Sequence, residues 1–534
     1  MEQREASRNG SFWLPLFVVV LGAFAAILNN SSINVALPKM MSIFGVSAED
    51  AEWILTAYML TSGVVIPVTG YLGDRLGTKR VYLACTVIFT IGSVLCSLAW
   101  NNSSMVAARV IQGIGGGAIM PVSMAIVYRI VPREKIGLAL GVWGMAAVCG
   151  PAVGPTLGGY IVDHLNWRFL FTMNIPVGIT GFFLAYILLP ESTLRQSLKF
   201  DTWGFISSAI GCFTLLLALS EGTKEGWSSF YIVSLLIFFF YALLLFVIVE
   251  LNHDQPMLDL SLFKNSIFSI SVFAGSLITV GLYGGVFLIP LFTQNLLLLT
   301  PYETGLILMP AAIVTALMMP VSGFLFDRFG PKILAVAGLT LTAWGTLEFH
   351  NLSLNTSSHS IMLFAALRSL GMGLAMMPIT TAGMNTVPAS QVGRASALSN
   401  VSRQVAGSFG IAILTAVMQN RQVFHYASLA EGTSINSNAV SLLNQLNGYL
   451  TYAGVADASD AAMAVLGGLV AEESLVRAID DTFIVAAVFI FIAIPLAFFL
   501  KKPVKKAGST QTPSDASARG GPVVPDKLSE SASN

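Results

Sequence analysis

Fourteen apolar stretches, each long enough to cross a lipid bilayer, constrain this chain more than any other feature of its sequence. A membrane-spanning helix needs about 20 apolar residues. Hydrophobic residues make up 55% of the 534 and charged residues only 10%, against about 25% charged for a soluble domain. We therefore predict an all-α, polytopic membrane protein that folds in the lipid bilayer. The predicted spans are 12–37, 51–72, 80–100, 104–129, 136–162, 168–190, 202–222, 228–250, 266–298, 303–326, 332–352, 360–386, 392–418 and 481–500.

The positive charges predict how these spans are oriented. With the N-terminus inside, most of the 28 Lys and Arg fall in inner loops and tails, as the positive-inside rule requires. An even number of spans then places both termini in the cytoplasm, so we predict a multi-pass protein of the cell (inner or plasma) membrane. Arg109 and Arg368 remain within spans, and Arg403 is assigned to the inner end of its span. The formal net charge is zero, which gives no reason to expect a nucleic-acid partner.

The sequence motifs of several enzyme classes are missing. The sequence contains no GxxxxGK[ST], no HExxH and no GxSxG, so an ATP motor, a zinc protease and a serine hydrolase are not supported. The four cysteines lie in apolar segments without metal-ligand spacing, and we interpret them as small buried hydrophobes. We predict no enzyme activity, no metal and no cofactor.

An internal repeat divides the chain into halves. GYLGDRLGTK at 70–79 recurs eight spans later as GFLFDRFGPK at 323–332, and RVIQGIGGGAIMP at 109–121 has a looser echo in RSLGMGLAMMP at 368–378. Such parallel repeats are typical of transporter halves. The predicted units are a six-helix half at 12–190, an inserted helix pair at 200–251, a second six-helix half at 266–501 that carries an external loop at 419–480, and a disordered cytoplasmic tail at 502–534.

Three local patterns predict where the chemistry and the movement lie. A buried cation such as Arg109 costs roughly 2.5–3.5 kcal/mol on insertion scales, so it indicates a functional site. Glycines every fourth residue let helices approach closely, and prolines weaken the hydrogen-bond ladder, which predicts either a gate or a rigid interface at Gly150, Pro151, Gly154, Pro155 and Gly158. Charged, glycine-flanked loops predict an inner latch, or else plain topology anchors, at Asp74, Arg75, Arg80, Asp327 and Arg328.

These motifs resemble the major facilitator superfamily. Residues 70–80 look like its motif A, 109–121 like motif B and 150–159 like motif C, and LNNSSINVALP at 28–38 resembles the first-helix motif of the fourteen-helix drug:proton antiporter branch that includes the EmrB and QacA exporters. The resemblance implies the major facilitator fold and export of drugs by alternating access. One position departs from the pattern: the branch usually has an aspartate where this chain has Asn29.

That departure bears on coupling to protons. The resemblance links Arg109 to proton coupling, and helix geometry places Asn29 at a similar depth, so we expect these two side chains, with Gln112, to form the relay. An amide does not titrate, and no Asp or Glu falls near the centre of a span. Glu348 and Glu221, at helix ends, are the substitute proton carriers.

A substrate cavity is predicted from polar and flexible residues within spans. Sparse polar groups and methionines in an apolar wall suit varied apolar ligands, here a small amphiphilic or cationic substrate. The predicted cavity residues are Asn30, Asn34, Tyr58, Gln294, Arg368, Met376, Asn400 and Gln404.

Three functions remain open from the sequence alone. The first is a multidrug exporter working by proton antiport. The second is a transporter or facilitator of one specific small molecule, not coupled through the usual helix 1 carboxylate. The third is a membrane sensor or scaffold without transport, with 419–480 as its binding element. We expect a monomer, joined by a periplasmic adaptor if the source is a double-membrane bacterium.

Overall fold

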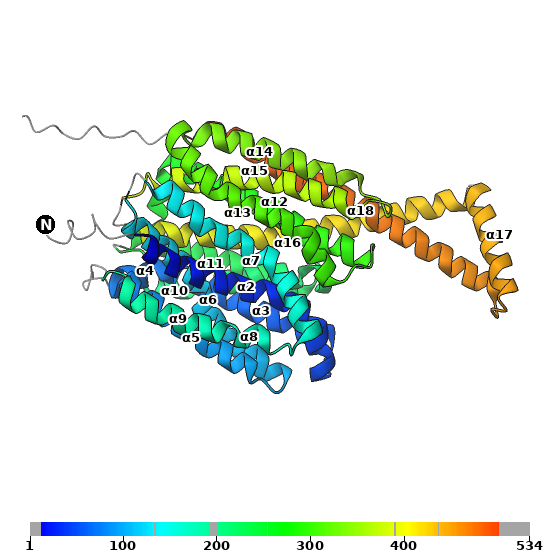
Figure 1. Cartoon of the computed structure of the whole chain (residues 1–534), viewed down its shortest axis with the longest axis horizontal. Helices are drawn as coiled ribbons and strands as arrows, with labels where there is room; N and C mark the ends of the chain where they lie inside the picture. Colours follow the sequence, from blue (N-terminus) through cyan, green and yellow to red (C-terminus); the bar gives the residue numbers. More distant parts are fainter. Residues whose placement is uncertain are drawn as a thin grey trace, which may run out of the picture. The chain divides into compact units, whose positions relative to one another are not determined.

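The regular structure of the chain is helical throughout the part that is described. The computed structural model describes residues 12–132, 135–191, 200–253, 255–388, 391–435 and 437–500 (Figure 1). The predicted disordered tail, 502–534, lies outside these residues.

The elements follow the order predicted for two halves and an inserted pair. Within 12–190 the helices are α2 (Trp13–Phe44), α3 (Ala48–Val65), α4 (Val68–Leu76), α5 (Thr78–Ser97), α6 (Asn102–Ile130), α7 (Ile136–His164), α8 (Phe169–Thr172) and α9 (Asn174–Leu188). The inserted pair is α10 (Thr202–Glu225) and α11 (Phe230–Asn252). The rest are η2 (Leu260–Lys264), α12 (Ser266–Asn295), α13 (Pro301–Phe329), α14 (Pro331–Leu347), η3 (Glu348–Asn351), α15 (Ser358–Met384), α16 (Val392–Ile435), α17 (Ser437–Tyr452) and α18 (Ala458–Phe498).

Twelve helices of the described part are long and apolar enough to cross a membrane, or up to fourteen if each bent pair counts as one span. One bent pair is α3 with α4, which meet at 54°. Pro67 stands at this break, where its missing N–H removes a hydrogen bond from the ladder. The other is α7, which bends by 41° between Ile136–Pro151 and Val153–His164. The predicted spans 51–72 and 136–162 are therefore broken helices.

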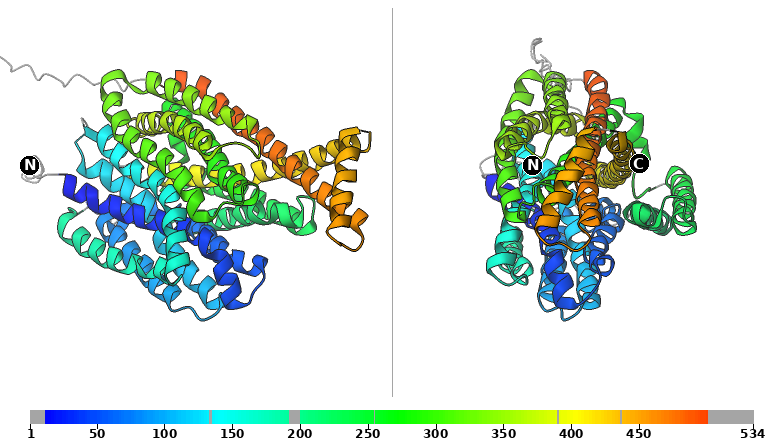
Figure 2. Two further views of the ribbon diagram at one scale, coloured as in Figure 1. Left: turned by 45° about the vertical axis from the view of Figure 1, so that its right-hand side comes forward. Right: turned by 90° about the vertical axis from the view of Figure 1, so that its right-hand side faces the viewer.

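The external segment 419–480 is largely helical, and the predicted loop with a short helical excursion understates its order. Helices α16 and α18 continue into it without interruption, and α17 packs against both. Figures 1 and 2 show α16 and α18 side by side as they leave the other helices. The drop in hydropathy at 419 was a poor guide, because a helix in water needs no apolar surface all round.

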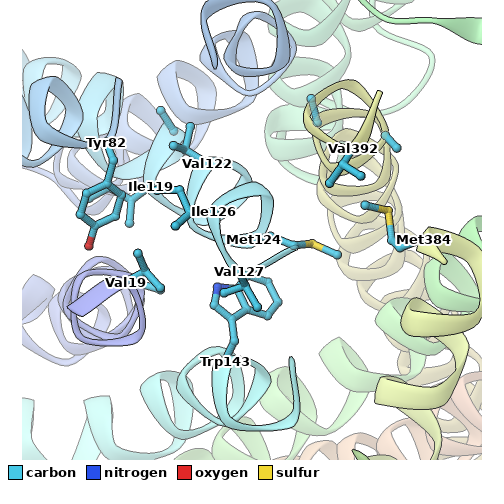
Figure 3. Packing of buried hydrophobic residues seen from close by; sticks show 14 of the residues in the cluster. Val19, Tyr82, Ile119, Val122, Met124, Ile126, Val127, Trp143, Met384 and Val392 are labelled. Atoms are coloured by element: carbon cyan, nitrogen blue, oxygen red, sulfur yellow. The ribbon is translucent and has the colours of Figure 1, made fainter. Parts of the chain in front are cut away.

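The apolar packing joins the two halves at one end only. We call this end, where α2 begins and α4 ends, the inner end, because the charge bias predicts it to be cytoplasmic. There a single cluster takes side chains from both halves, including Met124 on α6, Trp143 on α7, Met384 on α15 and Val392 on α16 (Figure 3). Towards the other end the clusters are separate, one around Met105 and Phe171 and one around Phe292 and Phe483. The inner end is therefore the closed end.

One helix pair nevertheless keeps the halves in contact along its length. Helix α7 packs against α2 on one side and α13 on the other. At the inner end a Cβ on Gly323 would lie 2.2 Å from the Gly137 carbonyl oxygen, and near the outer end a Cβ on Gly305 would lie 2.1 Å from the Thr156 hydroxyl oxygen. Only glycine allows such close backbone approach, so α7 and α13 form the hinge-like seam between the halves.

Candidate functional site

A cavity of about 380 Å³ lies between the two halves. Its walls come from α2 and α7 of the first half and from α12, α13 and α15 of the second. The volume is in the range of small-molecule sites. Three predicted cavity residues, Asn34, Gln294 and Arg368, line it. The other polar lining residues are Ser31, Asn295, Thr315 and Ser369, and no Asp or Glu is among the described residues of the wall.

The remaining predicted cavity residues do not line this space. Tyr58 is buried beneath Arg109, and the Asn400 amide donates to the Ser396 carbonyl oxygen of its own helix. Met376 and Gln404 are half-buried elsewhere on α15 and α16. Asn30 is exposed one helical turn from Asn34, on the same face of α2. That face was readable from the i, i+4 spacing of the two asparagines.

Arg109 is fully buried and its hydrogen bonds go to neutral acceptors. Its Nε donates to the Ile54 carbonyl oxygen at 3.0 Å, its Nη1 to Gln112 Oε1 at 2.6 Å and its Nη2 to Asn30 Oδ1 at 3.2 Å. The Tyr58 ring lies 4.1 Å from the guanidinium carbon, a cation–π contact that is strongest when desolvated. Gln112 in turn donates to Ser93. These contacts offset the cost of burying the charge.

The glycine run of α6 makes this arrangement possible. Added Cβ atoms would lie 2.2 Å from the Tyr58 hydroxyl at Gly116 and 2.4 Å from the Phe89 nitrogen at Gly115. Helix α6 is thus pressed against α3 on one side and α5 on the other. That close packing brings Arg109 within reach of the Ile54 carbonyl.

The expected contact between Asn29 and Arg109 is wrong, because the neighbouring amide, Asn30, makes it. Asn29 is fully buried and its Oδ1 accepts from Asn174 Nδ2 on α9 at 2.8 Å. Successive helical residues point about 100° apart, so adjacent asparagines on α2 cannot both face α6. The sequence missed Asn174, although it lies in an apolar tract where a buried amide needs a partner.

The glycines of α7 face α2 within the first half. Cβ atoms on Gly150, Gly154 and Gly158 would each lie within 3 Å of α2, at Ile27, Ser31 and Ser32. Pro155 has no N–H for the carbonyl of Pro151, four residues earlier, and the Ser31 hydroxyl donates to that carbonyl oxygen at 3.1 Å. Both prolines line the cavity. The glycine face is thus a close interface inside one half, on a helix that also bends beside the cavity.

The inner latch centres on Asp74, with partners the sequence did not predict. The carboxylate of Asp74 is buried and lies 3.4 Å from Arg129 Nη2 on α6 and 3.5 Å from Arg394 Nε on α16. Arg394 belongs to the second half, so this ion pair crosses between the halves. A Cβ on Gly70 would lie 3.0 Å from the Arg394 Cα, which shows how closely α4 and α16 meet.

The other predicted latch residues are placed differently. Arg75 and Arg80 are exposed, and Arg75 donates to the Tyr71 hydroxyl at 2.7 Å. In the second copy of the motif Arg328 is exposed over the Phe329 ring, and the side chain of Asp327 lies outside the described part.

Three further charged residues lie away from the cavity wall. Glu221 is on the last turns of α10 and Glu348 begins η3, so neither substitute proton carrier lines the cavity. Arg403 lies three turns into α16 and donates to Ser399 at 3.1 Å. Its assignment to the inner end of the span is therefore wrong, and it is an intramembrane arginine like Arg109 and Arg368.

Comparisons with known proteins agree with this architecture. A sequence model of the Major Facilitator Superfamily matches residues 19–411. The chain is 39% identical over 497 residues to the uncharacterized MFS-type transporter YhcA of Bacillus subtilis (strain 168), covering 91% of this chain and 92% of that protein. It is 30% identical over 448 residues to the multidrug export protein EmrB of Haemophilus influenzae, covering 82% and 87%. The human organic anion transporter MFSD10 superposes with a TM-score of 0.57 over 92% of this chain and all of that one. At 13% identity this last likeness shows the fold alone.

Proposed function

Because this chain belongs to the major facilitator superfamily and its relatives include multidrug exporters, we propose that it exports amphiphilic small molecules across the cell membrane by alternating access. The observation that carries the proposal is the cavity between α2 and α7 on one side and α12, α13 and α15 on the other. A site at the interface of two repeats is where such transporters bind their substrates. The apolar wall with few polar groups suits amphiphiles.

The two ends of the molecule support a two-state cycle. In this structure the inner end is closed by the shared apolar cluster and by the Asp74–Arg394 ion pair, while the cavity lies towards the outer ends of its helices. The opposite state requires Asp74 and Arg394 to separate while α7 and α13 stay in contact. Alternating access is thus a rocking of the halves about the α7–α13 seam.

We further propose that export is driven by proton antiport, with the relay built around Arg109, Gln112 and Asn30. Asn30 connects the two sites, because it accepts from Arg109 and lies on the cavity face of α2. A second candidate is transport that is not coupled through α2. The neutral acceptors around Arg109 and the absence of carboxylates among the described cavity residues favour it.

Purified protein in liposomes with an imposed pH gradient tests both proposals. Two probes share a dansyl fluorophore and a five-carbon linker: dansylcadaverine, a cation, and N-dansyl-6-aminohexanoate, an anion. Transport of either probe into the lumen, absent from protein-free vesicles and lost in Arg109→Met, is the expected result. If neither probe moves, export of amphiphiles is refuted. If a probe moves at a rate that ignores the gradient, proton antiport is refuted and the second candidate stands.

A further inference from the structure

Two arginines that the sequence treats alike have opposite environments. Arg109 has its Nε, Nη1 and Nη2 all bonded to protein acceptors, and it does not line the cavity. Arg368 does line the cavity, and both its hydrogen bonds come from Nη2, to the carbonyl oxygens of Gly281 at 2.7 Å and Leu282 at 3.0 Å. A guanidinium has five N–H donors, so most of the donors of Arg368 are not used in these bonds.

The unused donors of Arg368 are held in place by close packing. Its Nε has no hydrogen-bond partner among the described residues, although the side chain is only 5% exposed. A Cβ on Gly285 would lie 2.0 Å from Nη1, so the glycine leaves the space that the guanidinium occupies. The backbone of Arg368 is fixed from the other side by Gly345, where a Cβ would lie 2.5 Å from the Arg368 nitrogen. The cation is therefore preorganised at the wall.

The charge of Arg368 also lacks a counter-ion. The described cavity residues include no Asp or Glu, and carbonyl dipoles supply only partial negative charge. A buried cation with spare donors attracts an anion strongly, because the surrounding dielectric is low and its hydration has already been lost. A planar guanidinium matches the two oxygens of a carboxylate in particular.

The rest of the wall suggests what would accompany such an anion. Asn34, Gln294 and Ser369 offer neutral hydrogen-bonding groups, whereas Pro151, Ile289 and Leu308 offer apolar surface. An organic cation would find only amide and hydroxyl oxygens here and would be repelled by Arg368. An anionic head with an apolar body would satisfy both parts of the wall.

We propose that Arg368 is the substrate-binding cation of this cavity, and that the cavity selects amphiphiles carrying a carboxylate or a similar oxyanion over organic cations. This inference rests on the proposed export function and replaces the sequence-based expectation of a cationic substrate with a more specific one. Arg368 is assigned to binding and Arg109 to the buried relay, although the repeat places them at equivalent positions of the two halves.

Binding to purified protein in detergent tests the inference without requiring transport. Dansyl fluorescence is titrated with the anionic and the cationic probe. The wild type is expected to bind the anion more tightly. Arg368→Gln should weaken anion binding roughly 10- to 100-fold, the value of one or two charge-assisted hydrogen bonds, and should leave cation binding within about twofold.

Two further variants separate a binding role from a folding role. Arg368→Lys keeps the charge, so it should retain an anion preference that Arg368→Gln loses. Arg403→Gln removes an intramembrane charge away from the cavity and should leave the preference unchanged. Size-exclusion profiles of all variants should match the wild type. If Arg368→Gln fails to fold, the comparison of Arg368→Lys with Arg403→Gln decides: an equal loss of anion binding in both would overturn the proposal.

The outcomes distinguish this inference from the function on which it rests. Tighter binding of dansylcadaverine than of the anion by the wild type, or anion binding unaffected by Arg368→Gln, overturns the anion site. Export of amphiphiles would still stand if dansylcadaverine is carried across the vesicle membrane. Failure of both probes to move, with anion binding intact, would instead overturn export.

Discussion

Removing the carboxylate of Asp74 is expected to open the inner end of the molecule. In Asp74→Asn the amide cannot balance Arg394, which is buried at the contact between α4 and α16. Two unit charges 3.5 Å apart attract by about 5 kcal/mol at an effective dielectric constant near 20. Desolvation offsets part of this, and coupling energies between contacting residues run to about 3 kcal/mol.

The expected shift in population follows from that value. About 3 kcal/mol corresponds to roughly a 100-fold change in an equilibrium constant. An inner-open state populated at about 1%, which is usual for minor states, would rise to about half of the molecules. The arginine variant Arg394→Gln should have a similar effect, because it breaks the same pair.

Distances between two nitroxide labels at the inner end measure this population. Leu76 on α4 and Phe329 on α13 belong to different halves and are both exposed, so Leu76→Cys and Phe329→Cys accept labels after the four native cysteines are replaced. Asp74→Asn should add a longer distance to the single short one of the parent. Arg75→Gln is the matched control, since Arg75 is exposed and bonds Tyr71 instead. An unchanged distribution in Asp74→Asn, or the same change in Arg75→Gln, would refute the reasoning.

Three other substitutions give separate tests. Asn30→Ala should lower the free energy of unfolding by about 1–3 kcal/mol and impair transport, because Nη2 of Arg109 loses its acceptor; a larger effect of Asn29→Ala would contradict the assignment. Ser31→Ala should cost about 1–3 kcal/mol by orphaning the Pro151 carbonyl, and Ser32→Ala, which loses a bond only within its own helix, should cost less in the same thermal unfolding assay. Gly154→Ala places a Cβ 2.5 Å from the Ser31 hydroxyl and should destabilise by about 1–3 kcal/mol, and a variant as stable as the wild type would show that α2 and α7 can separate freely.

The sequence predicted the helices well because lipid imposes a one-dimensional rule. Each span must be apolar for about 20 residues, and this length can be read without knowing any neighbour. The same rule stops at the membrane surface, which explains why α16 and α18 run past 418 and 481 where a loop was expected. The break at Pro67 was not predicted, since apolar composition is the same for a straight and a bent helix.

Which side chains meet was harder to predict than which helices exist. Asn29 and Asn30 differ only by rotation about α2, and the resemblance to a family motif favoured the wrong one as the partner of Arg109. Arg394 was grouped with the inner loops, because nothing in the sequence shows that α16 begins against Asp74. Arg109 and Arg368 occupy matching positions of a repeat, and only the neighbouring glycines and carbonyls set their different environments.

The serine that donates to Pro151 has a counterpart with a bearing on how the chain is made. Pro378 leaves the carbonyl of Leu374 without its helical partner, and Ser322 on α13 donates to that oxygen at 2.7 Å. In both cases the serine helix comes earlier in the chain than the proline helix: α2 before α7, and α13 before α15. A carbonyl without a donor is costly in hydrocarbon. Synthesis from the N-terminus therefore delivers each donor into the bilayer before the ribosome produces the helix that needs it.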